Sequence, residues 1–151
     1  MTANKASAAD AVIREINQAC LLLRTRLISR VMTAIYDAGL RPFGIGSPQF
    51  ALLVVIGSLE PATRAEIGRY LHQDRSTLTR NLKLILSEGW AKEIQNEADG
   101  RARPIALTRA GRDLLRCAVP AWRVAQSRAK GLLAQDGVMA VMTIANRIVT
   151  S

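Results

Sequence analysis

Residues that catalyse reactions or bind metals are scarce in this sequence of 151 residues. It has one histidine, His72, and two cysteines, Cys20 and Cys117, which stand almost a hundred residues apart with no CxxC pair. That spacing argues against a metal site and against a disulfide framework. Because a nucleophile motif and a glycine-rich phosphate loop are also missing, we expect no enzyme activity, no catalytic residue and no cofactor.

Long hydrophobic runs are missing as well. The longest, such as residues 51–56, are far shorter than the roughly 20 apolar residues that a membrane-spanning helix needs. The first ten residues, MTANKASAAD, contain no apolar stretch of the kind that a secretory signal has. We therefore expect a soluble, cytoplasmic protein without a membrane partner, long enough to bury a proper core as one domain.

Acidic residues are few: 12 aspartates and glutamates face 21 lysines and arginines, which gives a formal charge of +9. Seventeen of the basic residues are arginines. The arginine guanidinium donates two parallel hydrogen bonds to phosphate, so an excess of arginine suits a polyanion. Composition alone leaves a nucleic-acid partner and an ordinary basic protein as equal alternatives.

Helical patterns dominate the first sixty residues. Ser7 can cap a helix over residues 8–38, and Gly39 would end it. At about 1.5 Å per residue this helix is about 45 Å long, more than a compact monomer needs, which suggests a partner subunit. Ser47 can then cap a second helix over residues 48–59, which begins with proline. It is apolar almost all round, so we expect it to be central.

A short helix, a tight turn and another helix come next. Thr63 and Glu66 have the spacing of a capping box for the short helix. After the turn HQD, Asp74 can cap a helix over residues 75–87, and Gly89 stands where that helix would end. This succession predicts a helix-turn-helix.

A hairpin follows the helix-turn-helix. Residues 90–95 and 103–107 have strand patterns, and the polar turn NEADGRA joins them, which predicts a wing. Arg101 and Arg103 lie at or beside the tip, from which an arginine can reach a minor groove. Asp99 can pair with an arginine and set its direction. The alternative is an ordinary charged turn.

One long helical pattern completes the chain. Thr108 can cap a helix that runs to about residue 134 and is bent at Pro120, where a backbone donor is missing. Residues 135–137 break the pattern, and residues 138–149 form a short terminal helix.

The helix over residues 75–87 contains no acidic residue. Its leucines and isoleucine gather on one side, which would pack on the preceding helices. The opposite side has small hydroxyl groups, which allow a close approach to DNA, and cations, which can bind guanine or phosphate. A solvated amphipathic helix is the alternative. The residues on this side or its flanks that we predict to contact DNA are Ser76, Thr77, Thr79, Arg80 and Lys83.

The stretches DRSTLTRNLKLILSEGWAKE and ADGRARPIALTRAGRDLL resemble the MarR family of bacterial transcription regulators, and the match extends backward through IYDAGLRPFGIGSPQFALLVVI. The Asp99-x-Arg101 wing signature followed by a strand and LTRAG is specific to this family among winged helices. One departure is Pro104, which cannot donate in a strand ladder and must face an edge or a bulge. This departure puts in question the angle of the wing and the role of Arg103.

The resemblance implies an α+β, mainly helical fold, with a winged helix-turn-helix lobe at residues 47–107 and a helical dimerisation lobe at residues 1–46 and 108–151. It implies a homodimeric repressor whose two recognition helices enter successive major grooves of a pseudo-palindromic operator in double-stranded DNA. It also implies DNA contacts from Arg101 of the wing and from these residues of the recognition helix: Arg75, Ser76, Thr77, Thr79 and Arg80.

Regulation is left with alternatives. The resemblance implies release from DNA by a small anionic or phenolic ligand, and Arg24, Arg26 and Arg30 are candidates to bind it, although solvated or interface charges are at least as good an interpretation. Cys20 lies close to where the peroxide-sensing branch of the family has its reactive thiol, and Arg24, one turn on, would lower the pKa of that thiol. A buried structural cysteine is the favoured interpretation. A winged-helix module that binds protein or RNA is the alternative function.

Overall fold

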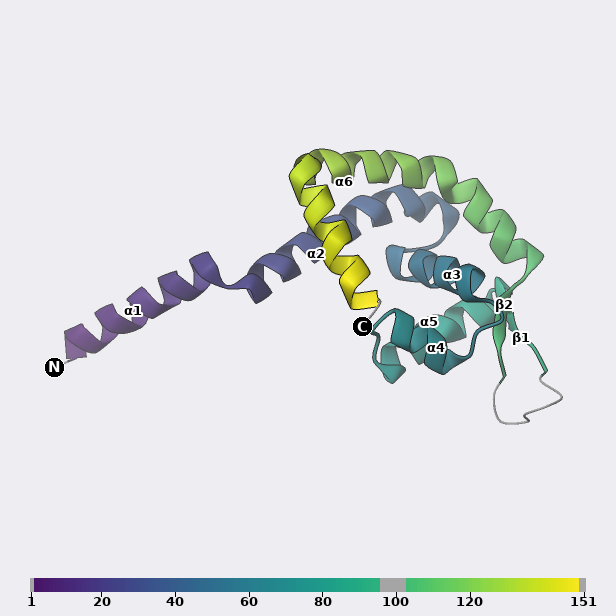
Figure 1. Ribbon diagram of the computed structural model, residues 1–151, viewed down its shortest axis with the longest axis horizontal. Coiled ribbons are helices and arrows are strands. Elements are labelled where there is room, and N and C mark those ends of the chain that lie inside the picture. The colour runs from purple at the N-terminus through teal and green to yellow at the C-terminus, as the bar shows by residue number, and fades with distance from the viewer. Residues whose placement is uncertain (1, 96–102, 150–151) are drawn as a thin grey trace. The chain divides into compact units, whose positions relative to one another are not determined.

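The computed structural model describes residues 2–95 and 103–149 (Figure 1). Contacts divide the chain into two compact units, Met1–Ala34 and Ile35–Ser151. The first unit contains helix α1 (Thr2–Ala19) and the larger part of α2 (Leu21–Leu40). The second contains every other element. The expected wing residues Asp99 and Arg101 lie outside the described residues.

The predicted single helix over residues 8–38 is wrong in its extent, because the structure has two helices separated at Cys20. In the gap, the Arg24 guanidinium donates to the Asn17 carbonyl oxygen at 2.6 Å. That oxygen is the acceptor that the Leu21 amide would use in a continuous helix. The interruption is local, since the Cys20 amide still donates to the carbonyl oxygen of Ile16 at 2.9 Å.

The end of α2 also differs from the prediction. Gly39 lies inside the helix. The α-helix ends at Leu40, and a 3-10 turn, η1 (Arg41–Phe43), follows it. Gly39 serves packing instead: a side-chain carbon there would stand 3.3 Å from the Ala121 carbonyl oxygen. Beside this contact, the Tyr36 hydroxyl hydrogen bonds the Gln126 side chain, and burial raises the pKa of Tyr36. The end of α2 is therefore held against α6.

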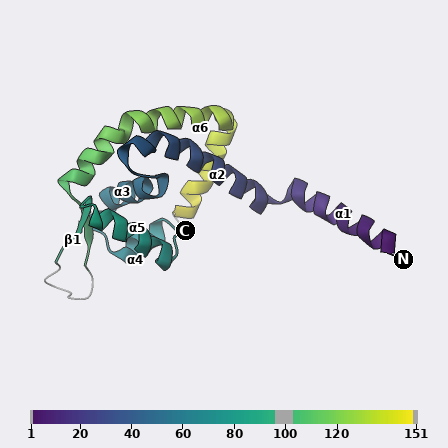
Figure 2. The same cartoon turned by 180° about the vertical axis from the view of Figure 1, so that it is seen from behind.

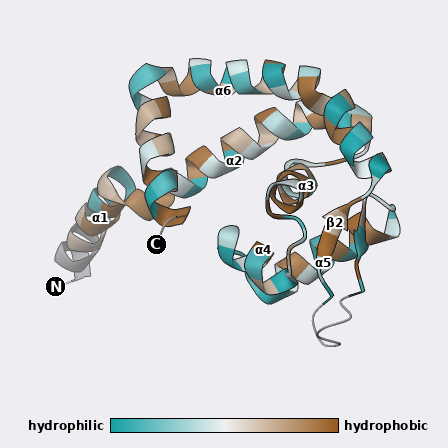
Figure 3. Ribbon diagram, turned by 45° about the vertical axis from the view of Figure 1, so that its right-hand side comes forward, coloured by the Kyte–Doolittle hydropathy of each residue, from teal (hydrophilic) through white to brown (hydrophobic). Residues whose placement is uncertain are grey.

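Helix α3 (Ser47–Leu59) is central, as predicted, although it begins one residue early, with Gly46 at the N-cap. It contacts α4, α5, α6 and β2. In the hydropathy view it is the most uniformly apolar helix of this unit (Figure 3). Its buried residues, with those of the neighbouring elements, form one core: Leu52, Leu53, Val55, Ile56, Ala62, Ile67, Leu78, Leu82, Ile85, Ala91, Ile105 and Leu107.

The helix-turn-helix is confirmed. Helix α4 (Arg64–Tyr70) begins with the capping box, in which Thr63 and Glu66 exchange hydrogen bonds. Helix α5 (Arg75–Ser87) is capped by Asp74. The helix ends at Ser87, and Gly89, two residues later, has a φ of 69°, a conformation that other residues rarely adopt.

The wing strands are shorter than predicted: β1 is Ala91–Glu93 and β2 is Ile105–Leu107, paired antiparallel (Figure 2). Pro104 stands just before β2, where its missing amide costs no ladder bond, and its carbonyl oxygen accepts from Ile94 at 2.7 Å. On its other edge β2 is bridged to Ala62. Strand β2 is thus enclosed between β1 and the chain that follows α3.

The last element, α6 (Arg109–Val149), is two helices joined at Ala134, whose backbone is not helical (φ 55°, ψ 175°). The break was predicted at residues 135–137, one position later. Thr108 caps the start as expected, accepting from the Gly111 amide at 3.1 Å. Helical structure continues through Pro120.

Candidate nucleic-acid interface

The start of α5 is built by Asp74. Its carboxylate accepts from the Ser76 hydroxyl at 2.6 Å and from the Thr77 amide at 2.9 Å. These two hydrogen bonds, the one from Ser76 first, hold the pKa of Asp74 well below its usual range. Asp74 is therefore a permanent anion at neutral pH, and the Ser76 hydroxyl is oriented toward it.

The faces of α5 are those that the sequence predicts. Leu78, Leu82 and Ile85 are buried and Leu86 is partly buried, so this side packs on the core. The Thr79 hydroxyl donates to the Arg75 carbonyl oxygen at 2.7 Å, so it is engaged within the helix. Of the predicted DNA contacts, Thr77 is partly buried and these are exposed: Arg75, Ser76, Thr79, Arg80 and Lys83.

An open groove of about 1050 Å³ lies between α4 and α5. It brings Arg75 and Thr79 together with Arg64 and Arg69, which the sequence did not single out. The sequence signal for these two arginines was that both belong to the first helix of the motif. They are five residues apart, so their side chains leave that helix about 140° apart. The groove is lined by Arg64, Ala65, Gly68, Arg69, His72, Gln73, Asp74, Arg75, Leu78 and Thr79.

The base of the wing joins two cations through one carboxylate. Glu93 Oε1 lies 2.7 Å from Arg64 Nη2, and Glu93 Oε2 lies 3.5 Å from Arg103 Nη1. Arg64 and then Arg103 hold the pKa of Glu93 below its usual range. Arg103 is therefore oriented by Glu93, which the sequence did not indicate as its partner, and 69% of its side chain stays exposed.

The residues considered for other chemistry are Cys20 and Arg24 in the first unit and His72, which lines the groove between α4 and α5. Cys20 is partly exposed at the gap between α1 and α2, and the Arg24 guanidinium is engaged by a backbone carbonyl. His72 has a φ of 46° in the turn between α4 and α5, and its Nε2 lies 3.2 Å from the Ile148 carbonyl oxygen. No cluster of three metal-binding side chains occurs among residues 2–95 and 103–149.

Comparison with known proteins connects this geometry to a family. The sequence profile of the MarR family matches residues 43–102. The chain is 31% identical over 98 residues to the uncharacterized HTH-type transcriptional regulator YwoH of Bacillus subtilis (strain 168), covering 65% of this chain and 64% of that protein. It is 35% identical over 95 residues to the organic hydroperoxide resistance transcriptional regulator of the same organism, covering 63% of each. The chain thus spans less than two thirds of either relative.

A solved structure extends the similarity to nearly the whole fold. The crystal structure of the M. tuberculosis transcriptional regulator MOSR in complex with DNA superposes with a TM-score of 0.73 at 34% identity. The similarity covers 85% of this chain and 93% of that one. With its helix-turn-helix, its wing and these relatives, the chain belongs to the MarR family of DNA-binding, winged helix-turn-helix transcription regulators.

Proposed function

We propose that two copies of this chain form a cytoplasmic repressor that binds a pseudo-palindromic operator in double-stranded DNA. The observation that carries the proposal is the exposed face of α5, which combines hydroxyl groups and cations, contains no acid, and borders an arginine-lined groove. A helix with short side chains at its start can lie deep in a major groove, and its cations then meet base edges and phosphates. We propose no enzymatic activity.

The DNA contacts fall into two groups. From α5, Arg80 is placed to bind a guanine edge, because it lies near the middle of the exposed face. The hydroxyl-bearing residues Ser76, Thr77 and Thr79 allow the close approach, while Arg75 and Lys83 meet phosphates. From the wing, the predicted tip residue Arg101, supported by Asp99, extends the contact to the adjacent minor groove. Arg103, at the base of the wing, meets a phosphate of the DNA backbone.

The dimer is supported by apolar side chains that the single chain leaves exposed. They occur in α1 and α2 within the first unit, and in the part of α6 that follows Ala134. By length and composition α6 would also pass as a membrane span. We interpret its apolar residues as a subunit interface instead, and assign residues 1–46 and 108–151 to the dimerisation lobe and 47–107 to the DNA-binding lobe. The exposed residues include Val12, Ile13, Ile16, Leu21, Leu22, Leu23, Leu27, Ile28, Val31, Met139, Met142, Ile144 and Ile148.

A small anionic or phenolic ligand would release the repressor. The support in this chain is a shallow hollow of about 400 Å³ on α2, lined by Thr25, Arg26, Ser29 and Arg30. A cysteine switch is the second candidate, since Cys20 is partly exposed at a helix break and one relative is a regulator of organic hydroperoxide resistance. Peroxide treatment that abolishes operator binding in the native chain, but not in Cys20→Ser, would favour the switch.

Selection of bound fragments from random duplexes tests the function. We expect a recovered sequence with two-fold symmetry, bound more weakly as salt rises, and a sedimentation mass of two chains without detergent. A winged-helix module for protein or RNA predicts neither a dyad nor a base preference. A folded monomer at micromolar concentration, or a need for detergent, would refute the dimer.

A further inference from the structure

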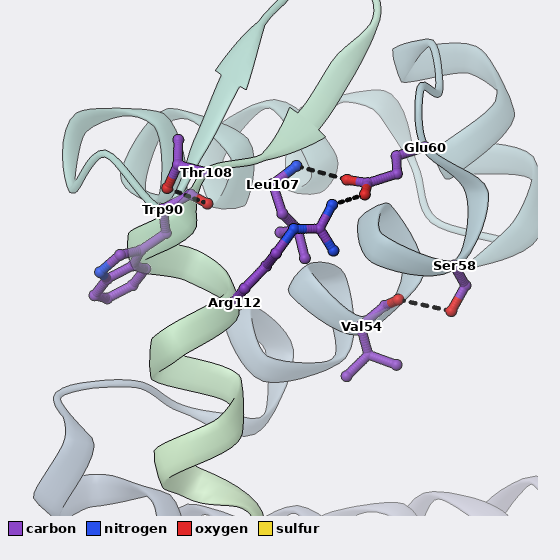
Figure 4. Close-up of polar contacts among 7 residues, drawn as sticks. All are labelled: Val54, Ser58, Glu60, Trp90, Leu107, Thr108 and Arg112. Atoms are coloured by element: carbon purple, nitrogen blue, oxygen red, sulfur yellow. Dashed lines mark hydrogen bonds and ion pairs between the residues drawn. The ribbon is translucent and has the colours of Figure 1, made fainter.

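One carboxylate, that of Glu60, joins three elements of the DNA-binding unit (Figure 4). Glu60 follows the last residue of α3, and only 19% of its side chain is exposed. Its Oε2 accepts from the Leu107 amide of β2 at 2.9 Å. Its Oε1 accepts from the Arg112 guanidinium of α6. These hydrogen bonds connect the central helix, the wing and the last helix at a single group.

The bond to Leu107 completes an edge of the wing. Ala62 and Ile105 exchange two backbone hydrogen bonds, at 2.8 and 3.1 Å, on the side of β2 away from β1. Two residues on, an antiparallel partner would have to supply a backbone carbonyl oxygen for the Leu107 amide. Glu60 supplies a side-chain oxygen in its place. Since Leu107 is buried, its amide would otherwise lack an acceptor in the interior.

The bond to Arg112 fixes a second point of α6. The first point is Thr108, whose hydroxyl lies 2.6 Å from the Gly89 carbonyl oxygen, to which it donates. Further along, α6 is held against the end of α2, where Gly39 packs on Ala121 and Tyr36 bonds Gln126. Arg112 lies one turn after Thr108, about 6 Å along the axis, so its bond to Glu60 helps to set the direction in which α6 leaves the wing.

We propose that Glu60 and Arg112 are positioning residues for DNA binding: their ion pair fixes the direction of α6 relative to the wing, and so the spacing of the two recognition helices in the dimer. This inference rests on the dimer proposed above. Neither residue lines the groove between α4 and α5, and neither is among the proposed DNA contacts. Their effect on binding is therefore exerted through α6.

The experiment compares Arg112→Gln with a matched control, Arg116→Gln. Both remove one charge from α6, but Arg116 pairs with Asp113 of the same helix, at 3.0 Å, and within the described part of the chain it connects no other element. Each protein is titrated on the selected operator and on operators with one or two base pairs inserted between or deleted from the half-sites. Sedimentation and thermal melting establish that the variants are folded dimers.

We expect the preference of Arg112→Gln for the native spacing to fall by about two- to fivefold, which is what a partly exposed ion pair can supply. Its log–log salt slope should stay unchanged, because Arg112 does not touch phosphate. Arg116→Gln should behave as the native chain. Arg112→Lys, which keeps the charge, should restore most of the spacing preference.

Glu60→Gln keeps an oxygen for the Leu107 amide and removes only the ionic contact with Arg112, so it should reproduce Arg112→Gln. The double variant should lose nothing further, since either change breaks the same pair. Additive losses, an unchanged spacing preference in the folded dimer, or a salt slope shallower by about one unit in Arg112→Gln would overturn the proposal. Should Glu60→Gln fail to fold, Arg112→Gln decides, because it leaves the acceptor of Leu107 in place.

A second readout separates this inference from the dimer. Spin labels at Ser87 of α5 and Arg123 of α6, in a chain without its native cysteines and diluted with unlabelled chain, report the distance distribution within one chain. Arg112→Gln should broaden that distribution and Arg116→Gln should leave it as it is. A monomeric native protein would refute the dimer alone, whereas an unchanged distribution in Arg112→Gln would refute the positioning role.

Discussion

The candidate interface has two cationic regions, the exposed face of α5 and the base of the wing. They differ in whether their basic side chains form ion pairs with a carboxylate. Within residues 2–95 and 103–149, Arg80 and Lys83 of α5 form no ion pair. At the base of the wing, Glu93 holds both Arg64 and Arg103.

We infer that this difference separates two tasks in binding DNA. An arginine without an ion-pair partner can adjust to a base edge, and its interaction then depends on sequence. An arginine held by a carboxylate has a fixed position and a partly neutralised charge, which suits a phosphate at a constant place along the backbone. We infer that α5 reads sequence and that the base of the wing sets register.

Replacement of Arg80 by alanine should have the largest effect. If Arg80 binds a guanine edge, Arg80→Ala costs about 1–3 kcal/mol on the operator and much less on random DNA. Fluorescence anisotropy titrations on both duplexes measure the two losses. Equal losses would make Arg80 a phosphate contact, and the contrast between the two regions would disappear.

Replacement of Arg64 should weaken binding on every sequence alike. If Arg64 meets a phosphate, the log–log salt slope of Arg64→Ala should be shallower by about one unit while the ratio of operator to random affinity is kept. Arg109→Ala is the control, since Arg109 is an exposed α6 arginine paired with Asp113. A change in base preference at one operator position would instead place Arg64 on a base.

Replacement of Glu93 should act in the opposite direction and more weakly. Glu93→Gln removes a negative charge close to the proposed path of the DNA backbone and releases Arg64 and Arg103. Affinity for random DNA should therefore rise. The ratio of operator to random affinity should fall, because both cations lose their fixed position. Reduced affinity on both duplexes would mean that holding the cations in place matters more than their charge.

The cap of α5 should show its effect in stability more than in binding. The pKa of Asp74 is lowered in the folded chain, so its contribution is complete above the ordinary value of 3.8 and is lost as the pH falls below it. Asp74→Ala should therefore reduce thermal stability at neutral pH and show a smaller further loss in acid. Asp74→Asn, which keeps a capping oxygen, should retain most of the stability at neutral pH. Melting curves between neutral and acid pH test this, and identical acid profiles for Asp74→Ala and the native chain would contradict it.

Helix starts were predictable because the groups that make them are close in sequence. Thr63 and Glu66 are three residues apart. Asp74 and Thr77, whose amide donates a hydrogen bond to the Asp74 carboxylate, are also three residues apart. Such contacts form wherever the chain turns into a helix, whatever surrounds it. The apolar period of α5 likewise fixed which side would be buried, and so which cations would be exposed.

The partners of the arginines were not predictable in the same way. Arg64 and Glu93 are 29 residues apart, and Arg112 and Glu60 are 52 apart. The sequence offers several acidic residues that could pair with each arginine. The packing around α3 determines which of them does. The gap at Cys20 was missed for a related reason. The Arg24 side chain donates to the Asn17 carbonyl oxygen, and the period of apolar residues does not reveal such a contact.

The sequence by itself thus determined the order of the elements, the caps of α4 and α5, the apolar core helix α3 and the acid-free face of α5, because these depend on hydrogen bonds and periods within a few residues. Only the tertiary structure decided that Glu93 orients Arg64 and Arg103 and that Glu60 ties β2 to α6. Side chains distant in the chain meet where the burial of α3, β2 and the start of α6 brings their backbones together, and that burial is a property of the whole unit.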